Sequence, residues 1–376
     1  MEKHKIAMIS DWYFPKVGGI EYSMHTLAKT LNTHGYEVSV ITRSYPGIPE
    51  YSRRDGVSVI RVKGRPLPGQ SRFLMPSAYK ELFGLLKNEN YEIINCHGLD
   101  SPIGMAALIA SQKLGIPVVV TNHSLVGDTP YRSLFYLAGK LLLKNADAVI
   151  AVSSAVEKDS KIMTKKPIYR IFNGVDSEDK IVKVPFPVDP EGKLVIVTVA
   201  RMTKKKGVQN IVDLAPSLLQ KYKNLLFVMI GDGELKEKLE KTVEELGISR
   251  NFYFTGEVSR EKVLGYLEQA DIFALPSINE AFGISILEAM SKEVPVVAMN
   301  NSGVSDIITN GVNGYLADSL TEFSSYLENL IEKSALRTSF SREALRGLSN
   351  YDWNRICEQT IRVYKHVTYE KYHNNR

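Results

Sequence analysis

Short apolar runs alternate along the chain with longer segments whose apolar residues recur every three or four positions. The first two runs, Lys5–Ser10 and Glu37–Thr42, flank a longer segment that extends from Ile20 to about His34, before Gly35. The short runs indicate buried strands, and the longer periodicity indicates a helix. Strands that alternate with helices favour a parallel sheet with helices on its faces. The beginning of the chain therefore predicts a strand–helix–strand unit of the doubly wound kind.

The same alternation predicts the elements of the rest of the chain. In the first half we expect an edge strand at Val57–Val62, strands at Tyr91–His97, Pro117–Ser124 and Lys166–Asp176, a helix at Ser101–Leu114, and a helix followed by a strand within Tyr131–Ser153. In the second half we expect strands that begin at Leu194, Leu225, Asn251, Asp271 and Pro295, and helices from Leu320 onward. The two halves show no sequence repeat, although they predict the same kind of architecture.

Residues 177–193 separate the two halves. They contain three prolines and many charged residues without periodicity, which is typical of a linker. A chain of 376 residues has the length of two domains at about 150 residues each. We therefore predict an α/β protein with two Rossmann-like, doubly wound parallel-sheet domains.

The composition narrows the class of protein. Hydrophobic residues make up 44% and charged residues 24% of the chain, which is ordinary for a soluble globular protein. No uncharged apolar run approaches the ~20 residues of a membrane span, and the apolar run near the start is too short for a signal peptide. We therefore expect a cytoplasmic protein. The two cysteines, Cys96 and Cys357, form neither a metal motif nor a disulfide framework.

The charge of the chain bears on its partners. The net charge of +5 suits an anionic substrate or an anionic membrane surface better than a nucleic acid, whose binding needs basic residues clustered on one face. The basic segment 45–72 predicts either a solvated loop or a patch that faces an anionic acceptor or lipid head groups.

The apolar segment that starts at Tyr131 carries Arg132, Lys140 and Lys144. It predicts either a helix on a membrane surface or a core helix with a basic rim. Peripheral contact with the inner face of the membrane is thus the alternative to a purely cytoplasmic location.

The strongest chemical signal lies between two strands of the second half. After the strand Asp271–Pro276 comes a loop with Glu280, and then a predicted helix that begins near Gly283 and contains Glu288. The first N–H groups of a helix are unpaired and suit a phosphate. The two carboxylates repel phosphate but suit hydroxyl groups. A ligand with a diphosphate in its middle and hydroxyl groups at both ends is a nucleotide sugar. The alternative is that both glutamates are solvated acids that favour the helix dipole.

Glu280 and Glu288, with Phe282-Gly283 between them, resemble the double-glutamate motif of retaining glycosyltransferase family 4, which has the GT-B fold. The resemblance implies that the first glutamate and the backbone amides after it contact the donor sugar and phosphate, and that the second glutamate contacts the ribose. The residues assigned to this loop are Glu280, Ala281, Phe282, Gly283, Ile284 and Glu288.

The chain departs from the family pattern at two places near this motif. Glu293 stands where the family usually has glycine. Ser302-Gly303 and Asp306 stand where it usually has Gly-Gly and a later glutamate. The first change affects a turn, and the second affects the loop on the phosphate side.

Further matches extend the resemblance over nearly the whole chain. Arg201 and Lys206 keep the R-x4-KG spacing, in which the family's arginine and lysine clamp the donor diphosphate. Gly231 lies in a glycine turn that borders the nucleotide in the family, and Val258 lies where backbone groups meet the base. Gly18-Gly19 stands where the family approaches the diphosphate, although a tight turn without a ligand would also explain two glycines.

Three residues of the first half are candidates for the sugar and the acceptor. His123 ends a predicted strand, where parallel sheets bind ligands. A lone histidine is more often a core residue with a satisfied ring, but the resemblance implies that His123 faces the donor sugar and helps catalysis. His97, at the end of another strand, and Glu21, after the glycine pair, are the acceptor-side candidates.

The resemblance also implies the division of labour between the domains. Residues 1–180 would form the acceptor-binding domain and residues 181–355 the donor-binding domain, with a cleft between them. A terminal helix at about 356–376 would pack back onto the first domain.

The chemistry needs cations because two negative charges grow on the leaving diphosphate. No D-x-D pair occurs in the sequence, so we predict no metal and no cofactor, and assign the charge stabilisation to Arg201, Lys206 and the helix near Gly283. No carboxylate is placed as a covalent nucleophile. We therefore expect a front-face reaction in which the leaving phosphate takes the acceptor's proton.

These inferences combine into one expected activity. We expect a retaining glycosyltransferase that moves a hexose or N-acetylhexosamine from a nucleotide-diphosphate sugar, UDP-sugar first and GDP-sugar second, to a lipid, polyol or saccharide. The stretches SDWYFPKVGGIE, NHSLVG and INEAFGISILEA resemble the group that transfers N-acetylglucosamine to phosphatidylinositol. The alternatives are a sugar-nucleotide epimerase, a phosphorylase with pyridoxal phosphate, and a scaffold that binds nucleotide sugars without turnover.

Overall fold

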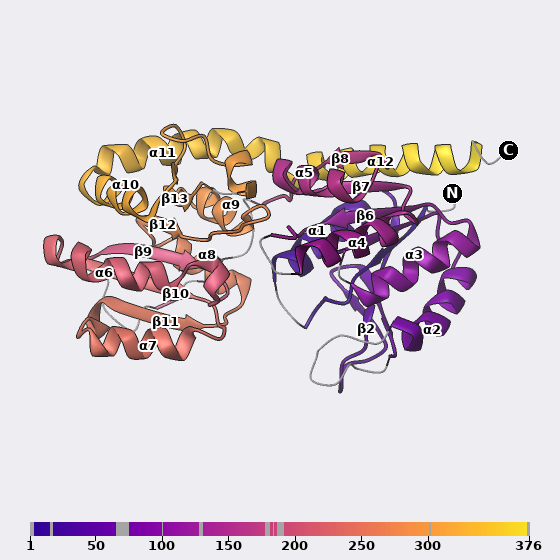
Figure 1. Ribbon diagram of the computed structural model, residues 1–376, viewed down its shortest axis with the longest axis horizontal. Helices are drawn as coiled ribbons and strands as arrows, with labels where there is room; N and C mark the ends of the chain where they lie inside the picture. The colour runs from indigo at the N-terminus through magenta and orange to yellow at the C-terminus, as the bar shows by residue number, and fades with distance from the viewer. Residues whose placement is uncertain are drawn as a thin grey trace. The chain divides into compact units, whose positions relative to one another are not determined.

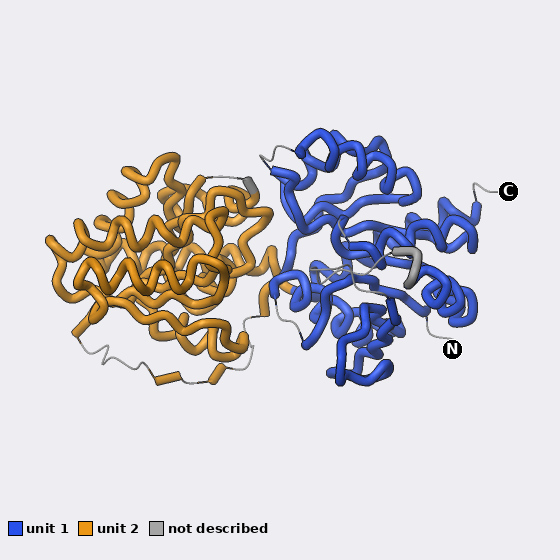
Figure 2. The backbone as a smooth tube through the Cα atoms, turned by 60° about the horizontal axis from the view of Figure 1, so that its bottom comes forward, with its two compact units in different colours: residues 1–174, 353–376 blue, residues 175–352 orange. Residues whose placement is uncertain are grey.

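The computed structural model describes residues 4–15, 18–64, 75–99, 101–127, 131–176, 181–182, 184–185, 192–300 and 302–373. The chain forms two compact units, and each contains one sheet with helices packed on it (Figures 1 and 2). Unit 1 comprises Met1–Gly174 and Trp353–Arg376, and unit 2 comprises Val175–Asp352. The chain thus passes from unit 1 to unit 2 after Gly174 and returns to unit 1 after Asp352. The domain boundaries expected from the sequence were residues 180 and 355.

Unit 1 contains an eight-stranded sheet in the order β3-β4-β2-β1-β5-β6-β7-β8. All of its neighbouring strands are parallel except β3 and β4. The strands are β1 (Lys5–Ile9), β2 (Glu37–Arg43), β3 (Tyr51–Arg54), β4 (Val57–Val62), β5 (Ile93–His97), β6 (Val118–Asn122), β7 (Ala148–Ala151) and β8 (Ile168–Arg170).

The prediction that Val57–Val62 is an edge strand is wrong. The strand β3 lies outside it and pairs antiparallel with it, with Tyr51 opposite Ile60. Asp55 and Gly56 join the two strands, and both have positive φ values, 47° and 82°. An Asp-Gly pair between extended segments is the sequence signal of a two-residue hairpin because its turn needs positive φ at both positions. The dipeptide could therefore have identified this hairpin from the sequence.

Helices cover both faces of the unit 1 sheet. The helices are α1 (Gly19–Thr33), α2 (Met75–Asn88), α3 (Pro102–Leu114), α4 (Arg132–Leu143), α5 (Ser154–Met163) and α12 (Trp353–His373). Alternate residues of β1 face opposite sides, as the pleat of a strand requires. Ala7 and Ile9 pack with α2 and α3, whereas Ile6 and Met8 pack with α1 and α12. The helix α2 was not predicted from the sequence.

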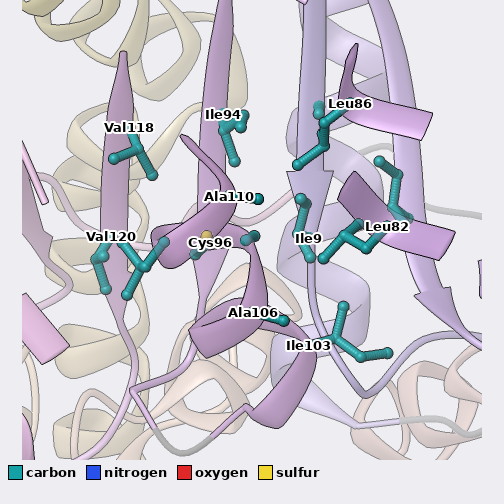
Figure 3. Close-up of a cluster of buried hydrophobic side chains, with 14 of the residues drawn as sticks. Ile9, Leu82, Leu86, Ile94, Cys96, Ile103, Ala106, Ala110, Val118 and Val120 are labelled. Carbon is teal, nitrogen blue, oxygen red and sulfur yellow. The ribbon is translucent and has the colours of Figure 1, made fainter. Parts of the chain in front are cut away.

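The first of these cores is the one that Figure 3 shows. Ile9 and Cys96 on the sheet lie against Leu82 of α2 and against Ile103 and Ala106 of α3. Small residues on α3 allow this helix to lie close to the sheet. The helix α3 starts at a capped position, because Ser101 Oγ accepts from the backbone N–H of Gly104.

Unit 2 contains a six-stranded sheet in the order β11-β10-β9-β12-β13-β14, in which every pair of neighbours is parallel. The strands are β9 (Leu194–Val199), β10 (Leu225–Ile230), β11 (Phe252–Gly256), β12 (Ile272–Leu275), β13 (Val296–Met299) and β14 (Tyr315–Ala317). The helices are α6 (Gln209–Lys221), α7 (Lys236–Glu245), α8 (Arg260–Leu267), α9 (Ile284–Ser291), α10 (Leu320–Glu332) and α11 (Ser334–Gly347), with the short 3-10 helices η1 (Lys204–Lys206), η2 (Ser249–Asn251), η3 (Ser302–Asp306) and η4 (Leu348–Tyr351).

The order of the strands in each sheet indicates where a ligand would bind. In unit 1 the chain moves outward from β1 through β2 and β4, and then returns to the other side of β1 with β5. In unit 2 it moves from β9 through β10 and β11 and returns with β12. Ligands of such sheets bind beyond the carboxyl ends of the two strands at this switch point. The topology therefore favours the loops that follow β1 and β5 in unit 1, and β9 and β12 in unit 2.

None of the helices in the part of the chain described above is both long enough and apolar enough to span a bilayer.

Candidate active site

The loops after β9 and β12 bring a lysine and a glutamate together. Lys206 Nζ lies 2.6 Å from Glu280 Oε2, although the two residues are 74 positions apart in the sequence. Their side chains are 30% and 15% exposed, so the pair is partly sheltered but open on one side. A cation and a carboxylate thus stand side by side at the switch point of the unit 2 sheet.

A glycine fixes the distance between these two loops. Gly207 has a φ of +64°, and a Cβ atom there would lie 2.0 Å from the backbone oxygen of Pro276. Any other residue would force the loops apart. The backbone N–H of Ile278 also donates to the oxygen of Lys205 at 3.1 Å. Backbone contacts between the two loops therefore fix the position of Lys206, in addition to the contact of its side chain with Glu280.

Arg201 supplies a second cation on the loop after β9. Its side chain is exposed, and among the described residues it has no hydrogen-bond or ion-pair partner. Its backbone is nevertheless held in place: the N–H of Met202 donates to the oxygen of Asp232, and the N–H of Thr203 donates to the oxygen of Arg201, both at 2.8 Å. An exposed guanidinium on a fixed backbone is suited to bind an anionic group.

The helix α9 begins beside Glu280, as the sequence predicted. Its N-cap is Gly283, with a φ of 104° and no side chain that caps the first N–H groups. The loop is held from behind by Gly303, whose N–H donates to the oxygen of Glu280 at 2.9 Å. A Cβ atom on Gly303 would lie 2.0 Å from the oxygen of Ala281. In the pair Ser302-Gly303, glycine therefore stands at the position where this contact requires it.

Glu288 lies on the second turn of α9 and is buried. Its Oε1 accepts from Nε of Arg260, the first residue of α8, at 2.7 Å. Glu288, the residue predicted to contact the ribose, is thus one member of an ion pair. Arg260 was not among the predicted site residues, because an arginine at the start of a helix has no distinctive sequence signal.

Two further positions lie in neighbouring loops of the same edge. Gly231, directly after β10, has a φ of +130°, and a Cβ atom there would lie 2.2 Å from the oxygen of Ala200. Val258 follows β11 and is half-buried. Together with Arg201, Lys206 and Glu280, these residues come from the carboxyl ends of four adjacent strands of the unit 2 sheet.

In unit 1, His97 and His123 form a pair at the ends of β5 and β6. Nδ1 of His97 lies 3.0 Å from Nε2 of His123, and the rings stack with centroids 5.2 Å apart. Burial lowers the pKa of His123 to about 4. Burial, and in addition the neighbouring His123, lower the pKa of His97 well below its ordinary value. Both rings are therefore neutral at pH 7, and one donates its single N–H to the other.

The pairing of the two histidines could have been anticipated from the sequence. Each ends a strand, and the register places His97 beside Thr121, two residues before His123. His97 also lines a small pocket with Ser23 and Asn173. Its Nε2 is buried and has no hydrogen-bond partner among the described residues. This nitrogen is therefore a polar atom that a water molecule in the pocket could satisfy.

The remaining candidates lie at the start of α1. Gly18 is the N-cap in an extended conformation, and Glu21 in the first turn is buried. A Cβ atom on Gly18 would lie 2.5 Å from Oε2 of Glu21, so the carboxylate folds back over the helix start beside Gly18 and Gly19. A carboxylate at this place repels an anion. The start of α1 therefore suits a ligand with hydroxyl groups better than a phosphate.

Two protein-family models match the chain. The model "Glycosyltransferase Family 4" matches residues 17–179, and the model "Glycosyl transferases group 1" matches residues 181–346.

Several curated proteins are similar over nearly the full length. A phosphatidylinositol N-acetylglucosaminyltransferase GPI3 subunit of Saccharomyces cerevisiae is 27% identical over 96% of this chain and 83% of its own length. A human phosphatidylinositol N-acetylglucosaminyltransferase is 27% identical over 98% of this chain and 77% of its own length. An uncharacterised glycosyltransferase of Methanocaldococcus jannaschii is 28% identical over 96% of this chain and 98% of its own length.

Solved structures share the fold. A sucrose-phosphate synthase from Thermosynechococcus elongatus superposes with a TM-score of 0.82 at 18% identity, over 97% of this chain and 99% of that one. The Anabaena protein HepE, solved with UDP and glucose, superposes with a TM-score of 0.80 at 20% identity, over 96% of this chain and 100% of that one. These likenesses, with the two parallel sheets, confirm the predicted GT-B fold.

Proposed function

The chain belongs to the glycosyltransferases that the two family models describe, and from that premise we propose that it transfers a hexose or N-acetylhexosamine from UDP with retention of the anomeric configuration. The proposed acceptor is a lipid, polyol or saccharide. The names of the yeast and human relatives favour N-acetylglucosamine as the sugar and a phosphatidylinositol-like lipid as the acceptor.

The observation that carries this proposal is the contact between Lys206 and Glu280 at the switch point of the unit 2 sheet. When the bond between the anomeric carbon and the diphosphate breaks, negative charge grows on the departing phosphate. Lys206 and Arg201 would stabilise that charge as fixed cations. Glu280 accepts from Lys206 with one oxygen, which leaves its other oxygen to bind a hydroxyl group of the sugar.

The nucleotide would lie along the same edge of the sheet. Glu288 is suited to accept from the ribose hydroxyl groups, and its contact with Arg260 holds the carboxylate in place. Gly231 lets the turn after β10 pack closely against the backbone of Ala200, and Val258 lies on the loop after β11, where the base would bind. The N–H groups at the start of α9 would add hydrogen bonds to the phosphate.

The acceptor would bind to unit 1. His97 and His123 are neutral, so neither repels a cation-like sugar in the transition state, and Glu21 can accept from an acceptor hydroxyl group. No carboxylate is placed as a nucleophile in this scheme. The leaving phosphate accepts the proton of the acceptor on the face that it departs from, without a metal ion or a cofactor.

Calorimetry with UDP, GDP and ADP tests the donor site. We expect UDP to bind most tightly, and Lys206→Ala to weaken UDP binding about tenfold or more, because a charge-assisted hydrogen bond is lost. Turnover should fall about 100-fold or more. Glu280→Ala should reduce turnover while the affinity for UDP stays nearly unchanged, because its proposed contact is to the sugar.

The matched control is Lys204→Ala, which removes an exposed lysine two positions away. It should leave both binding and turnover unchanged. A Lys206→Ala variant that binds UDP as tightly as the original protein would overturn the assignment. The anomeric configuration of the product, read by NMR, tests retention.

A further inference from the structure

The helix α4 presents an apolar face to solvent. Tyr131, directly before the helix, is 67% exposed, and four large apolar residues on the helix itself are more than half exposed. These are Leu134 at 63%, Phe135 at 52%, Leu137 at 54% and Leu141 at 56%. A surface helix of a soluble protein normally turns polar residues outward. We call the face formed by Leu134, Phe135, Leu137 and Leu141 the α4 face.

The opposite side of α4 is firmly packed, so the α4 face is not the result of a loosely placed helix. Gly139 and Leu143 are buried, and a Cβ atom on Gly139 would lie 2.4 Å from Sδ of Met163 on α5. The hydroxyl group of Tyr136 donates to Asp159 of α5 at 2.5 Å. Two helices in such close contact fix which side of α4 points outward.

The spacing of the leucines confirms this direction. Leu134, Leu137 and Leu141 are three and four positions apart, so they form one stripe along the helix. Gly139 and Leu143 lie on the other side at 100° per residue. The stripe therefore points away from α5 and away from the core of unit 1.

The charges around the stripe are all positive. Lys140 and Lys144 lie beside it at 100° per residue, Arg132 lies on the side of Gly139 and Leu143, and no acidic residue occurs between Asp128 and Asp147. Asp159, the carboxylate that α5 presents to α4, already accepts from Tyr136 and from the backbone N–H of Val126.

We propose that the α4 face binds the surface of an anionic phospholipid bilayer. The leucine stripe would enter the boundary between head groups and acyl chains, with Lys140 and Lys144 at the level of the phosphates. A second copy of this chain fits less well, because a two-fold interface brings each patch against itself and would place these cations near their own equivalents. The inference rests on the surface of α4 and is independent of the transfer reaction.

Vesicle flotation tests the apolar part of the α4 face. We expect the protein to float with vesicles of phosphatidylcholine and phosphatidylglycerol, and much less with phosphatidylcholine alone. The double variant Leu134→Glu/Leu141→Glu should lower the partition coefficient by on the order of 100-fold, because two buried leucines are lost from the contact. The matched control is Leu246→Glu, which changes a leucine of unit 2 that is 47% exposed and should bind as the original protein does.

The basic residues are tested separately. Lys140→Gln and Lys144→Gln should each lower binding to the anionic vesicles about fivefold, since each basic residue near the surface contributes about 1 kcal/mol. Lys238→Gln removes an exposed lysine of unit 2 and should have no effect. Equal losses in all three variants would mean that only net charge matters, and would overturn the assignment to α4.

A spectroscopic measurement keeps the test independent of any loss of folding. Phe135→Trp places a tryptophan on the α4 face, and vesicles of brominated phospholipid should quench its fluorescence. Leu246→Trp, the control, should be quenched no more than the two native tryptophans of the unaltered protein. Absence of quenching, or a sedimentation velocity that shows a dimer in buffer which Leu134→Glu/Leu141→Glu converts to a monomer, would overturn the proposal in favour of self-association.

Discussion

Arg260 donates from Nε to Oε1 of Glu288 at 2.7 Å, and the two side chains are only 14% and 9% exposed. This pair joins the first turn of α8 to the second turn of α9. The same carboxylate is the one that the family motif assigns to the ribose. The proposed ribose ligand is therefore held in place by a residue that the motif does not include.

The variant Arg260→Gln should destabilise unit 2 and weaken UDP binding together. It leaves the Glu288 carboxylate buried without its cation, which costs about 3 kcal/mol of unfolding free energy when one partner of a buried pair is removed. Urea denaturation and calorimetry with UDP measure the two effects. The double variant Arg260→Gln/Glu288→Gln should recover part of the stability but not the affinity. Full affinity in Arg260→Gln would contradict a role for this pair in the nucleotide site.

The variant Gly303→Ala should reduce turnover far more than it reduces stability. A Cβ atom there would lie 2.0 Å from the backbone oxygen of Ala281, so the loop that carries Glu280 must move. We expect kcat to fall about 100-fold, the usual size of the effect when a transition-state contact is misplaced. The control is Gly347→Ala, a helix residue with nothing within 4 Å of its Cβ position, which should keep full activity.

The variant Glu293→Gly should stabilise the protein. Glu293 has a φ of 60°, a left-handed conformation that costs about 1–2 kcal/mol for a residue with a Cβ atom. Glycine removes that strain but gains entropy in the unfolded chain, so we expect a net gain of about 0.5 kcal/mol by urea denaturation. Lys292→Gly, one position earlier with a φ of −104°, should destabilise instead. The family's usual glycine at this turn thus has a conformational explanation.

The histidine pair should make stability depend on pH in the acidic range. The pKa of His123 falls from its ordinary value of 6.5 to about 4 in the folded state. The unfolded chain therefore binds more protons between these values. The stabilisation is complete above about pH 6.5 and is lost as the pH falls toward 4, by about 3 kcal/mol from His123 alone.

Urea denaturation across that pH range measures the effect. His123→Asn should flatten the profile, whereas His34→Gln, which changes an exposed histidine, should leave it as it was. An unchanged profile in His123→Asn would show that other groups cause the acid sensitivity.

Removal of divalent metal ions should leave turnover unchanged. In the proposed mechanism, Arg201, Lys206 and the start of α9 would provide the positive charge that a metal ion supplies in other transferases. An assay with EDTA, against the same assay with added Mg²⁺, measures this directly. Loss of activity in EDTA that Mg²⁺ restores would refute catalysis by protein cations alone.

The pattern of apolar residues predicted most strands of both sheets, because strands buried on both faces are nearly continuous apolar runs. It missed β3, whose residues Tyr51–Arg54 are all exposed and so have no apolar pattern. It also missed α2, since the segment before it is rich in proline and arginine and reads as a loop. In both cases the tertiary contacts, and not the local pattern, determine the element.

The candidate site shows the same division. The spacing of Arg201, Lys206, Glu280 and Glu288 made these residues the candidates, because a motif records which side chains the chemistry needs, and their roles stay predictions. The contact of Lys206 with Glu280 follows from the topology, which places β9 beside β12. The contact of Arg260 with Glu288 depends on packing between two segments that no motif links, so it became visible only in the structure. The pairing of His97 with His123, in contrast, agrees with the positions of both residues at strand ends in the sequence. The sequence also left open whether the apolar residues of α4 face the core or the solvent. The structure shows that Leu134, Leu137 and Leu141 face the solvent.

The helix α12 belongs to unit 1, although it follows unit 2 in the sequence. Ile356, Tyr364 and Val367 lie in the core with β1 and α1, and the hydroxyl group of Tyr364 accepts from Asn95 at 2.7 Å. Residues 175–352 must therefore leave the ribosome before unit 1 can close its core. Unit 2, whose residues are contiguous in the sequence, is able to fold first. Until α12 is synthesised, the residues of β1 and α1 that pack against it stay uncovered, and a chaperone could bind them.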